Sequence, residues 1–131
     1  MFLVTANKVR QLLYLSFIGQ VSVAQLQQGR QDVVSLLADL ENGFRVLADL
    51  SRLDGMDINC ATEIGRVMEL CDQKGVGLVI RIIPDPSKDI GLNILTQFHY
   101  RLRPRIMTCN SLAGAEAALQ LGDTDPTEKS T

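Results

Sequence analysis

The strongest constraint on the fold comes from residues 76–83, which read Val-Gly-Leu-Val-Ile-Arg-Ile-Ile and stop at Pro84. A strand with one face in water alternates apolar and polar residues, whereas an almost continuously apolar run is typical of a strand covered on both faces. The single charge in the run, Arg81, then needs a carboxylate or a sheet edge, and we interpret it as structural. The run therefore predicts a sheet with helices packed on it.

Strand and helix patterns alternate along the rest of the chain. Further strands are expected at residues 2–6, 11–18, 44–50 and 105–109. Helices are expected at residues 61–73 and 111–120, after Ser22 as far as Leu40, and after the capping residue Ser87. Because a short polar turn joins the first two strands, they should form an antiparallel hairpin, and the sheet should be mixed.

The chain has 131 residues, of which 46% are hydrophobic. This length is sufficient for one compact domain and too short for two. We predict an α/β fold: a single domain at residues 1–121, with a mixed sheet of about five strands and about four helices. Residues 122–131 are polar, and we expect a disordered tail there.

Composition argues against several functional classes. The formal net charge of -2, the absence of Trp and the presence of only four Phe and two Tyr argue against nucleic-acid binding. No basic segment precedes the first apolar residues, as a signal peptide would require, and polar residues interrupt the apolar stretch at 12–23. We therefore expect a cytoplasmic protein that does not enter a membrane.

The cysteines and the histidine suggest no chemistry of their own. Cys60, Cys71 and Cys109 form no C-x-x-C pair, which fits a reducing compartment without disulfides. His99 is the one histidine, and neither a zinc site nor a catalytic triad can be assembled around it from sequence motifs. We predict no metal, no cofactor and no catalytic residues, and hence a protein that is not an enzyme.

The most informative junction is the one between the strand at 44–50 and the helix that follows it. Asn59 precedes the helix and is predicted to be its N-cap. Asp57 can either bind a basic group of a partner or shape the turn through an Asx turn, and the residues leave both readings open. Cys60 is either a small packing residue, which we favour, or a redox thiol with a lowered pKa. Thr62 and Ser51 carry the neighbouring hydroxyl groups, and both are weak candidates for phosphorylation.

This junction carries a resemblance to a known family. The segment Leu47-Ala-Asp-Leu-Ser-Arg-Leu-Asp-Gly-Met-Asp-Ile-Asn-Cys60 looks like the strand and Asp-Ser-Ser-Gly type turn of STAS domains, which occur in sulfate-transporter tails and bacterial anti-sigma-factor antagonists (SpoIIAA-like). Gly75 with the strand after it, and the final helix pattern Ser111-Leu-Ala-Gly-Ala-Glu-Ala-Ala-Leu119, are similar to later parts of that family. The layout matches over about residues 8 to 120, judged against the usual size of a domain.

The resemblance implies a regulatory function, but this chain departs from the family pattern at one position of the turn. In members that a kinase switches, the residue two after the motif's Asp is a phosphorylated Ser or Thr, and here it is Asn59, which has no hydroxyl. We therefore expect a divergent, non-enzymatic module that binds a protein such as a regulatory kinase or a sigma-factor regulator. The expected contact residues are Asp57, Asn59, Cys60, Thr62, Pro84, Asp85 and Ser87, since loops at the carboxyl ends of parallel strands converge.

Two further possibilities stay open. The layout also resembles the architecture of lipid-carrying Sec14-type proteins, which would imply a small apolar ligand between the third helix and the sheet, near Phe98 and Tyr100. A homodimer could form through an exposed strand edge or through the N-terminal hairpin.

Overall fold

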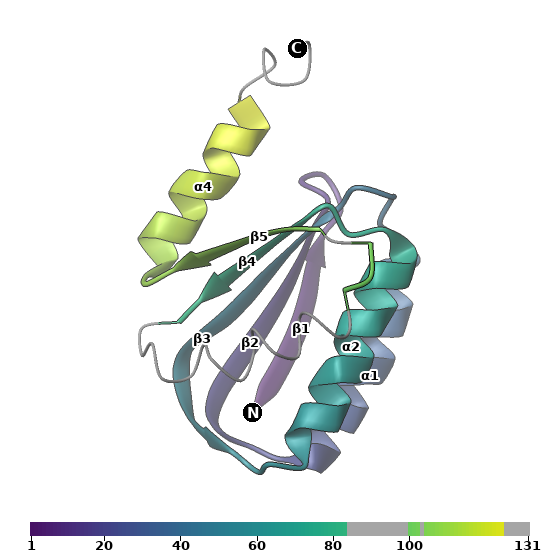
Figure 1. Cartoon of the computed structure of the whole chain (residues 1–131), viewed down its shortest axis with the longest axis vertical. Coiled ribbons are helices and arrows are strands. Elements are labelled where there is room, and N and C mark those ends of the chain that lie inside the picture. Colours follow the sequence, from purple (N-terminus) through teal and green to yellow (C-terminus); the bar gives the residue numbers. More distant parts are fainter. Residues whose placement is uncertain (84–99, 103, 125–131) are drawn as a thin grey trace.

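A computed structural model describes residues 1–83, 100–102 and 104–124, which form one five-stranded sheet and three helices (Figure 1). The elements are β1 (Phe2–Asn7), β2 (Leu12–Val21), α1 (Val23–Leu37), β3 (Arg45–Met56), α2 (Cys60–Lys74), β4 (Leu78–Ile82), β5 (Arg105–Cys109) and α4 (Leu112–Thr124). The predicted α/β class is confirmed. Of the four helices we expected, the one after Ser87 lies in residues 84–99, outside the described residues.

The strands lie side by side in the order in which they occur in the chain. β1 and β2 pair antiparallel, with Val4 opposite Leu15, so the predicted hairpin and the mixed sheet are confirmed. The other neighbouring strands pair in parallel, and α1 and α2 are the crossovers between β2, β3 and β4 (Figure 1).

Each face of the sheet has its own apolar cluster. α1 and α2 cover one face of the sheet, and α4 lies on the other (Figure 1). Val46 and Val79 belong to the cluster under α1 and α2, whereas Leu47 and Ile80 belong to the cluster that packs with α4. Side chains alternate along a strand, so β4 can be buried almost throughout only if both faces are covered. The reading of the apolar run at 76–83 is thereby confirmed.

Strand β3 is longer than its sequence suggests. We expected it to end at Leu50, because several polar residues follow, but it continues to Met56. The polar residues Ser51, Arg52 and Asp54 do not break it because each is exposed to solvent, while Leu53 remains buried. The last pair with β4 joins Asp49 to Ile82, and the seven residues beyond it extend about 23 Å further, paired with β2.

The helix boundaries follow their capping residues. Ser22 and Gln25 form a capping box at the start of α1. α1 ends at Leu37 rather than at Leu40, although Leu40 is buried in the same apolar cluster as α1. α2 ends where Gly75 adopts φ 95°, a left-handed conformation that suits glycine.

At the other end of the chain, α4 continues to Thr124, beyond the expected end at Gln120 and into the segment that we expected to be a tail. None of the helices in the described part of the chain is both long enough and apolar enough to cross a bilayer.

Candidate functional site

The turn between β3 and α2 has a fixed backbone conformation. The carboxylate Oδ1 of Asp57 accepts the N–H of Asn59 at 2.8 Å, and the carbonyl of Asp57 accepts the N–H of Cys60 at 2.9 Å. The first bond is an Asx turn, so this reading of Asp57 is confirmed. Asp57 is an exposed residue, so its second carboxylate oxygen can be reached from the solvent. The carboxyl group can therefore shape the turn and still face a partner.

Asn59 occupies the N-cap position of α2, but its side chain makes no capping hydrogen bond. The expectation that the amide caps the helix was therefore wrong. A capping side chain normally needs an extended backbone at the cap, whereas Asn59 has φ −68° and ψ −14°, which is helical. The amide group is exposed and carries polar atoms that a partner could contact.

Cys60 is packed in the interior next to the turn and does not form part of the surface of the turn. Only 1% of the residue is exposed, and its Sγ–H donates to the carbonyl of Val21 at the end of β2, with an Sγ–O distance of 3.5 Å. Burial raises the pKa of the Cys60 thiol, and the charges of Asp57 and Glu63 act in the same direction. Its inclusion among the contact residues was wrong. The packing reading holds, and the proposed lowered pKa of a redox thiol is contradicted.

Ile58 is the residue of this turn that sequence reasoning missed. Its side chain is 87% exposed, although isoleucine is a large apolar residue. The signal was present in the sequence, since a β-branched apolar residue between Asp57 and Asn59 has no expected role in a polar turn. Thr62 lies in the first turn of α2 and is exposed. The surface of the junction therefore consists of one apolar side chain among polar groups.

The other predicted contact residues, Pro84, Asp85 and Ser87, lie outside the described residues. We expected them beside the turn because both segments follow parallel strands. In the observed register β4 ends level with Asp49, whereas β3 reaches the turn only after Met56. The strand end that the turn does adjoin is that of β2, where Met56 pairs with Val21.

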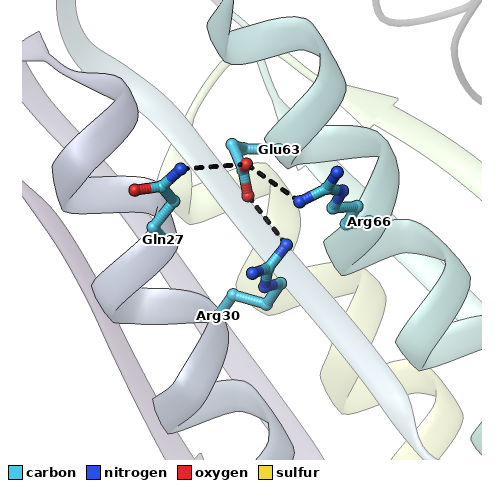
Figure 2. A network of polar contacts seen from close by, with 4 residues as sticks. All are labelled: Gln27, Arg30, Glu63 and Arg66. Atoms are coloured by element: carbon cyan, nitrogen blue, oxygen red, sulfur yellow. Dashed lines mark hydrogen bonds and ion pairs between the residues drawn. The ribbon is translucent and has the colours of Figure 1, made fainter.

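A buried carboxylate joins the start of α2 to α1. Glu63 is 4% exposed, and it accepts hydrogen bonds from Gln27 and Arg30 on α1 and from Arg66 one turn along α2 (Figure 2). The Arg30 Nη1–Glu63 Oε2 distance is 3.0 Å, and the Arg66 Nη1–Glu63 Oε1 distance is 3.3 Å. This cluster fixes the first turn of α2, and with it the junction, against α1.

A second polar cluster lies on the α4 face of the sheet. Asp49 accepts hydrogen bonds from the Tyr14 hydroxyl at 2.9 Å and from the Ser51 hydroxyl at 2.6 Å. Burial alone would raise the pKa of Asp49, but the bonds from Ser51 and Tyr14, with the charge of Arg52, lower it overall. Ser51 lies within β3 and not at its end, and its hydroxyl is engaged by Asp49. A role for Ser51 as a phosphoacceptor therefore has little structural support.

The apolar cleft expected for a small ligand is partly described. Tyr100 is buried, and with Arg81 it lines a cavity of about 40 Å³ between the sheet and α1 and α2. An apolar cavity that binds benzene measures about 150 Å³, so this space is too small for an acyl chain. Phe98 lies outside the described residues. Arg81 donates to the Thr108 hydroxyl at 3.0 Å, in keeping with a structural role.

Comparison with known proteins identifies the fold. SpoIIAA, an anti-sigma-factor antagonist, aligns in its unphosphorylated form with a TM-score of 0.61, at 18% identity, over 95% of this chain and 100% of its own. The chain has the SpoIIAA-like fold. An uncharacterised Shewanella loihica protein of SpoIIAA-like fold aligns with a TM-score of 0.66, at 16% identity, over 91% and 92% of the two chains.

An anti-sigma-factor antagonist from Mycobacterium paratuberculosis aligns with a TM-score of 0.57, at 16% identity, over 92% of this chain and 93% of its own. No family model matches the sequence, and no curated protein matches it. The SpoIIAA-like fold is thus established by structural similarity, in agreement with the resemblance found in the sequence.

Proposed function

We propose that this SpoIIAA-like domain is a non-enzymatic regulatory module that binds another protein through the turn at residues 57–62 and the start of α2. The observation that carries the proposal is the 87% exposure of Ile58 in a turn whose backbone is fixed by Asp57. An apolar side chain held in one conformation can enter a pocket of a partner at little cost in conformational entropy. The polar residues Asp57, Asn59 and Thr62 of the same segment are exposed as well.

The similarity to anti-sigma-factor antagonists supports the same class of function. SpoIIAA has been solved in phosphorylated and unphosphorylated forms, so that protein has two covalent states. We propose that this chain lacks the corresponding switch, because Asn59 stands where the resemblance expects a hydroxyl. Partner binding would then depend on the presence of the partner and not on modification of residue 59.

The proposal is tested by calorimetric titration of the purified chain with ATP-bound anti-sigma-factor kinases and other sigma-factor regulators encoded near its gene. We expect one of them to bind, and Ile58→Asp to weaken binding at least about 30-fold, as expected for an interface residue worth about 2 kcal/mol. Asp57→Ala should weaken the same complex, because it removes the carboxylate and loosens the turn.

Val9→Asp is the matched control. Val9 is 95% exposed in the β1–β2 hairpin, at the other end of β2 from the junction, and, as in Ile58→Asp, an exposed β-branched aliphatic side chain is replaced by a carboxylate. It should leave the affinity unchanged. Binding that survives both Ile58→Asp and Asp57→Ala would contradict the proposed surface, and a complete panel without binding would contradict the proposed function.

The apolar-ligand alternative predicts a different result. Native mass spectrometry of the purified chain would show a copurified acyl compound if the domain carried lipid, and we expect the mass of the chain alone. Kinase treatment provides a separate test of the missing switch. We expect no phosphate on the wild-type turn, and an Asn59→Ser variant that gains one would show that the kinase still recognises the surface.

A further inference from the structure

Strand β1 forms one edge of the sheet and leaves a row of backbone groups pointing outward. Met1 and Ile18 exchange hydrogen bonds, with N–O distances of 2.6 and 2.8 Å. Hydrogen-bonded and non-hydrogen-bonded pairs alternate along an antiparallel ladder, and the β1–β2 register has no bulge. The N–H and C=O groups of Phe2, Val4 and Ala6 therefore point away from β2, and β1 has no second neighbour among the described strands.

Within residues 2–7, this edge strand carries no charged side chain, proline or bulge that would hinder pairing with another strand. Natural edges carry charges, proline or bulges that prevent such pairing. Residues 2–7 read Phe-Leu-Val-Thr-Ala-Asn, without a charge or a proline. Leu3 and Met1 remain 46% and 53% exposed at the same edge. An unguarded edge with exposed apolar side chains fits an interface better than a solvated surface.

We propose that β1 pairs antiparallel with β1 of a second copy of this chain, about a two-fold axis at Val4. In this register Val4 lies opposite Val4 of the other chain, and Phe2 lies opposite Ala6 of the other chain. These pairs are hydrogen-bonded pairs with two backbone hydrogen bonds each, so that six backbone hydrogen bonds would form in total. On the opposite face of the sheet, Leu3 would face Thr5.

The strand favours a copy of itself as the occupant because its sequence is self-complementary in this register. A bulky residue meets a small one at each outer pair, a β-branched residue meets itself at the centre, and no like charges are brought together. A two-fold axis closes the assembly at two chains, since each copy has one β1 edge and uses it up.

The pairing would give a ten-stranded sheet with both copies of α1 on the same face. Because the axis is perpendicular to the sheet, the two β3–α2 turns would lie at opposite ends and remain accessible. The proposal is thus independent of the partner surface proposed above, and either can fail without the other.

Sedimentation velocity over a concentration series tests the proposal on the whole chain. We expect the wild type to shift from 14.4 kDa toward twice this mass as its concentration rises. The double variant Leu3→Lys with Thr5→Lys would place lysines opposite lysines at two positions, and its dimer dissociation constant should rise more than tenfold. Leu3→Lys with Thr5→Glu is the matched control, because it places opposite charges together and should retain the dimer.

Amide hydrogen exchange tests the surface without a substitution. The amides of Val4 and Ala6 should become protected as the dimer forms, since their N–H groups point away from β2 and have no partner among the described residues. A wild type that stays monomeric at every concentration would overturn the proposal. A dimer in which these two amides exchange as fast as in the monomer, or one that the two lysines leave intact, would overturn it as well.

Discussion

At the scale of single residues, the environment of a group decides its chemistry more than its position in a motif. Cys60 lies at the positive end of α2, where a thiol pKa is often lowered, yet burial raises it. Burial also raises the pKa of Cys71 to about 12. Cys109, on β5, is only half-buried. The thiol group that reagents can reach is therefore not the one in the candidate site.

We predict that a thiol reagent such as iodoacetamide modifies Cys109 first in the native protein in mildly alkaline buffer, because Cys109 is the least buried of the three cysteines. Cys60 and Cys71 should react only after unfolding, because both are buried and remain protonated in that buffer. Peptide mass mapping after timed labelling measures this order. A Cys109→Ser variant should lose the fast phase, and rapid native labelling of Cys60 would contradict the packing role given to it.

At the scale of elements, a close approach of helix and sheet decides how α1 lies on β1. Gly29 faces the ring of Phe2, and a methyl group at Gly29 would overlap that ring. Phe2 in turn packs against Phe17 with a ring-centroid distance of 4.9 Å. The glycine is therefore needed for the spacing between the layers, not for a special backbone conformation.

We predict that Gly29→Ala destabilises the fold by about 1 to 3 kcal/mol, which is the usual cost of overpacking a core. The gain in helix propensity, about 1 kcal/mol at most, should not compensate for it. Ser35→Ala is the matched control, because Ser35 is exposed on the same helix and its substitution should cost nothing. Urea unfolding of both variants measures the difference, and a stabilised Gly29→Ala would show that Phe2 can move aside.

At the scale of the whole molecule, α4 covers the central part of the second face of the sheet. Ala115 and Leu119 are fully buried against Leu47, Ile80 and Ile82. The guanidinium of Arg45, on the central strand β3, also donates to the carbonyl of Leu119 at 3.2 Å. The C-terminal helix is thus an integral part of the domain.

We predict that Leu119→Ala destabilises the domain by about 2 to 5 kcal/mol, the range for removing a buried leucine side chain. Thermal unfolding should remain a single transition, because both apolar clusters share β3 and β4. Ala118→Ser, at a partly buried neighbouring position, is the control for a change on α4 that leaves the core filled. Two separate transitions in Leu119→Ala would show that the α4 face unfolds independently.

Sequence patterns predicted the class of fold because they record burial. The run at 76–83 required two covered faces, and the structure has two apolar clusters. The predicted ends of the strands were less accurate where polar residues continue a strand, as they do beyond Leu50 in β3. A strand can include such residues wherever its side chains are exposed to solvent. For the candidate site, the Asx turn of Asp57 was among the readings of the sequence and is observed. The exposure of Ile58 and the burial of Cys60 depend on which side of the turn faces β2, which local sequence does not encode.

Apolar contacts have no preferred direction, so two helices held by them alone could slide past each other by a turn at small cost. A carboxylate that must be met by donors at defined positions removes that freedom. Glu63 accepts from Gln27 and Arg30, which lie three residues apart on α1, and a shift of α1 by one turn would withdraw at least one of these donors from a buried charge. The cluster in Figure 2 thus selects one register between α1 and α2. It does so whether or not it adds to the free energy of unfolding.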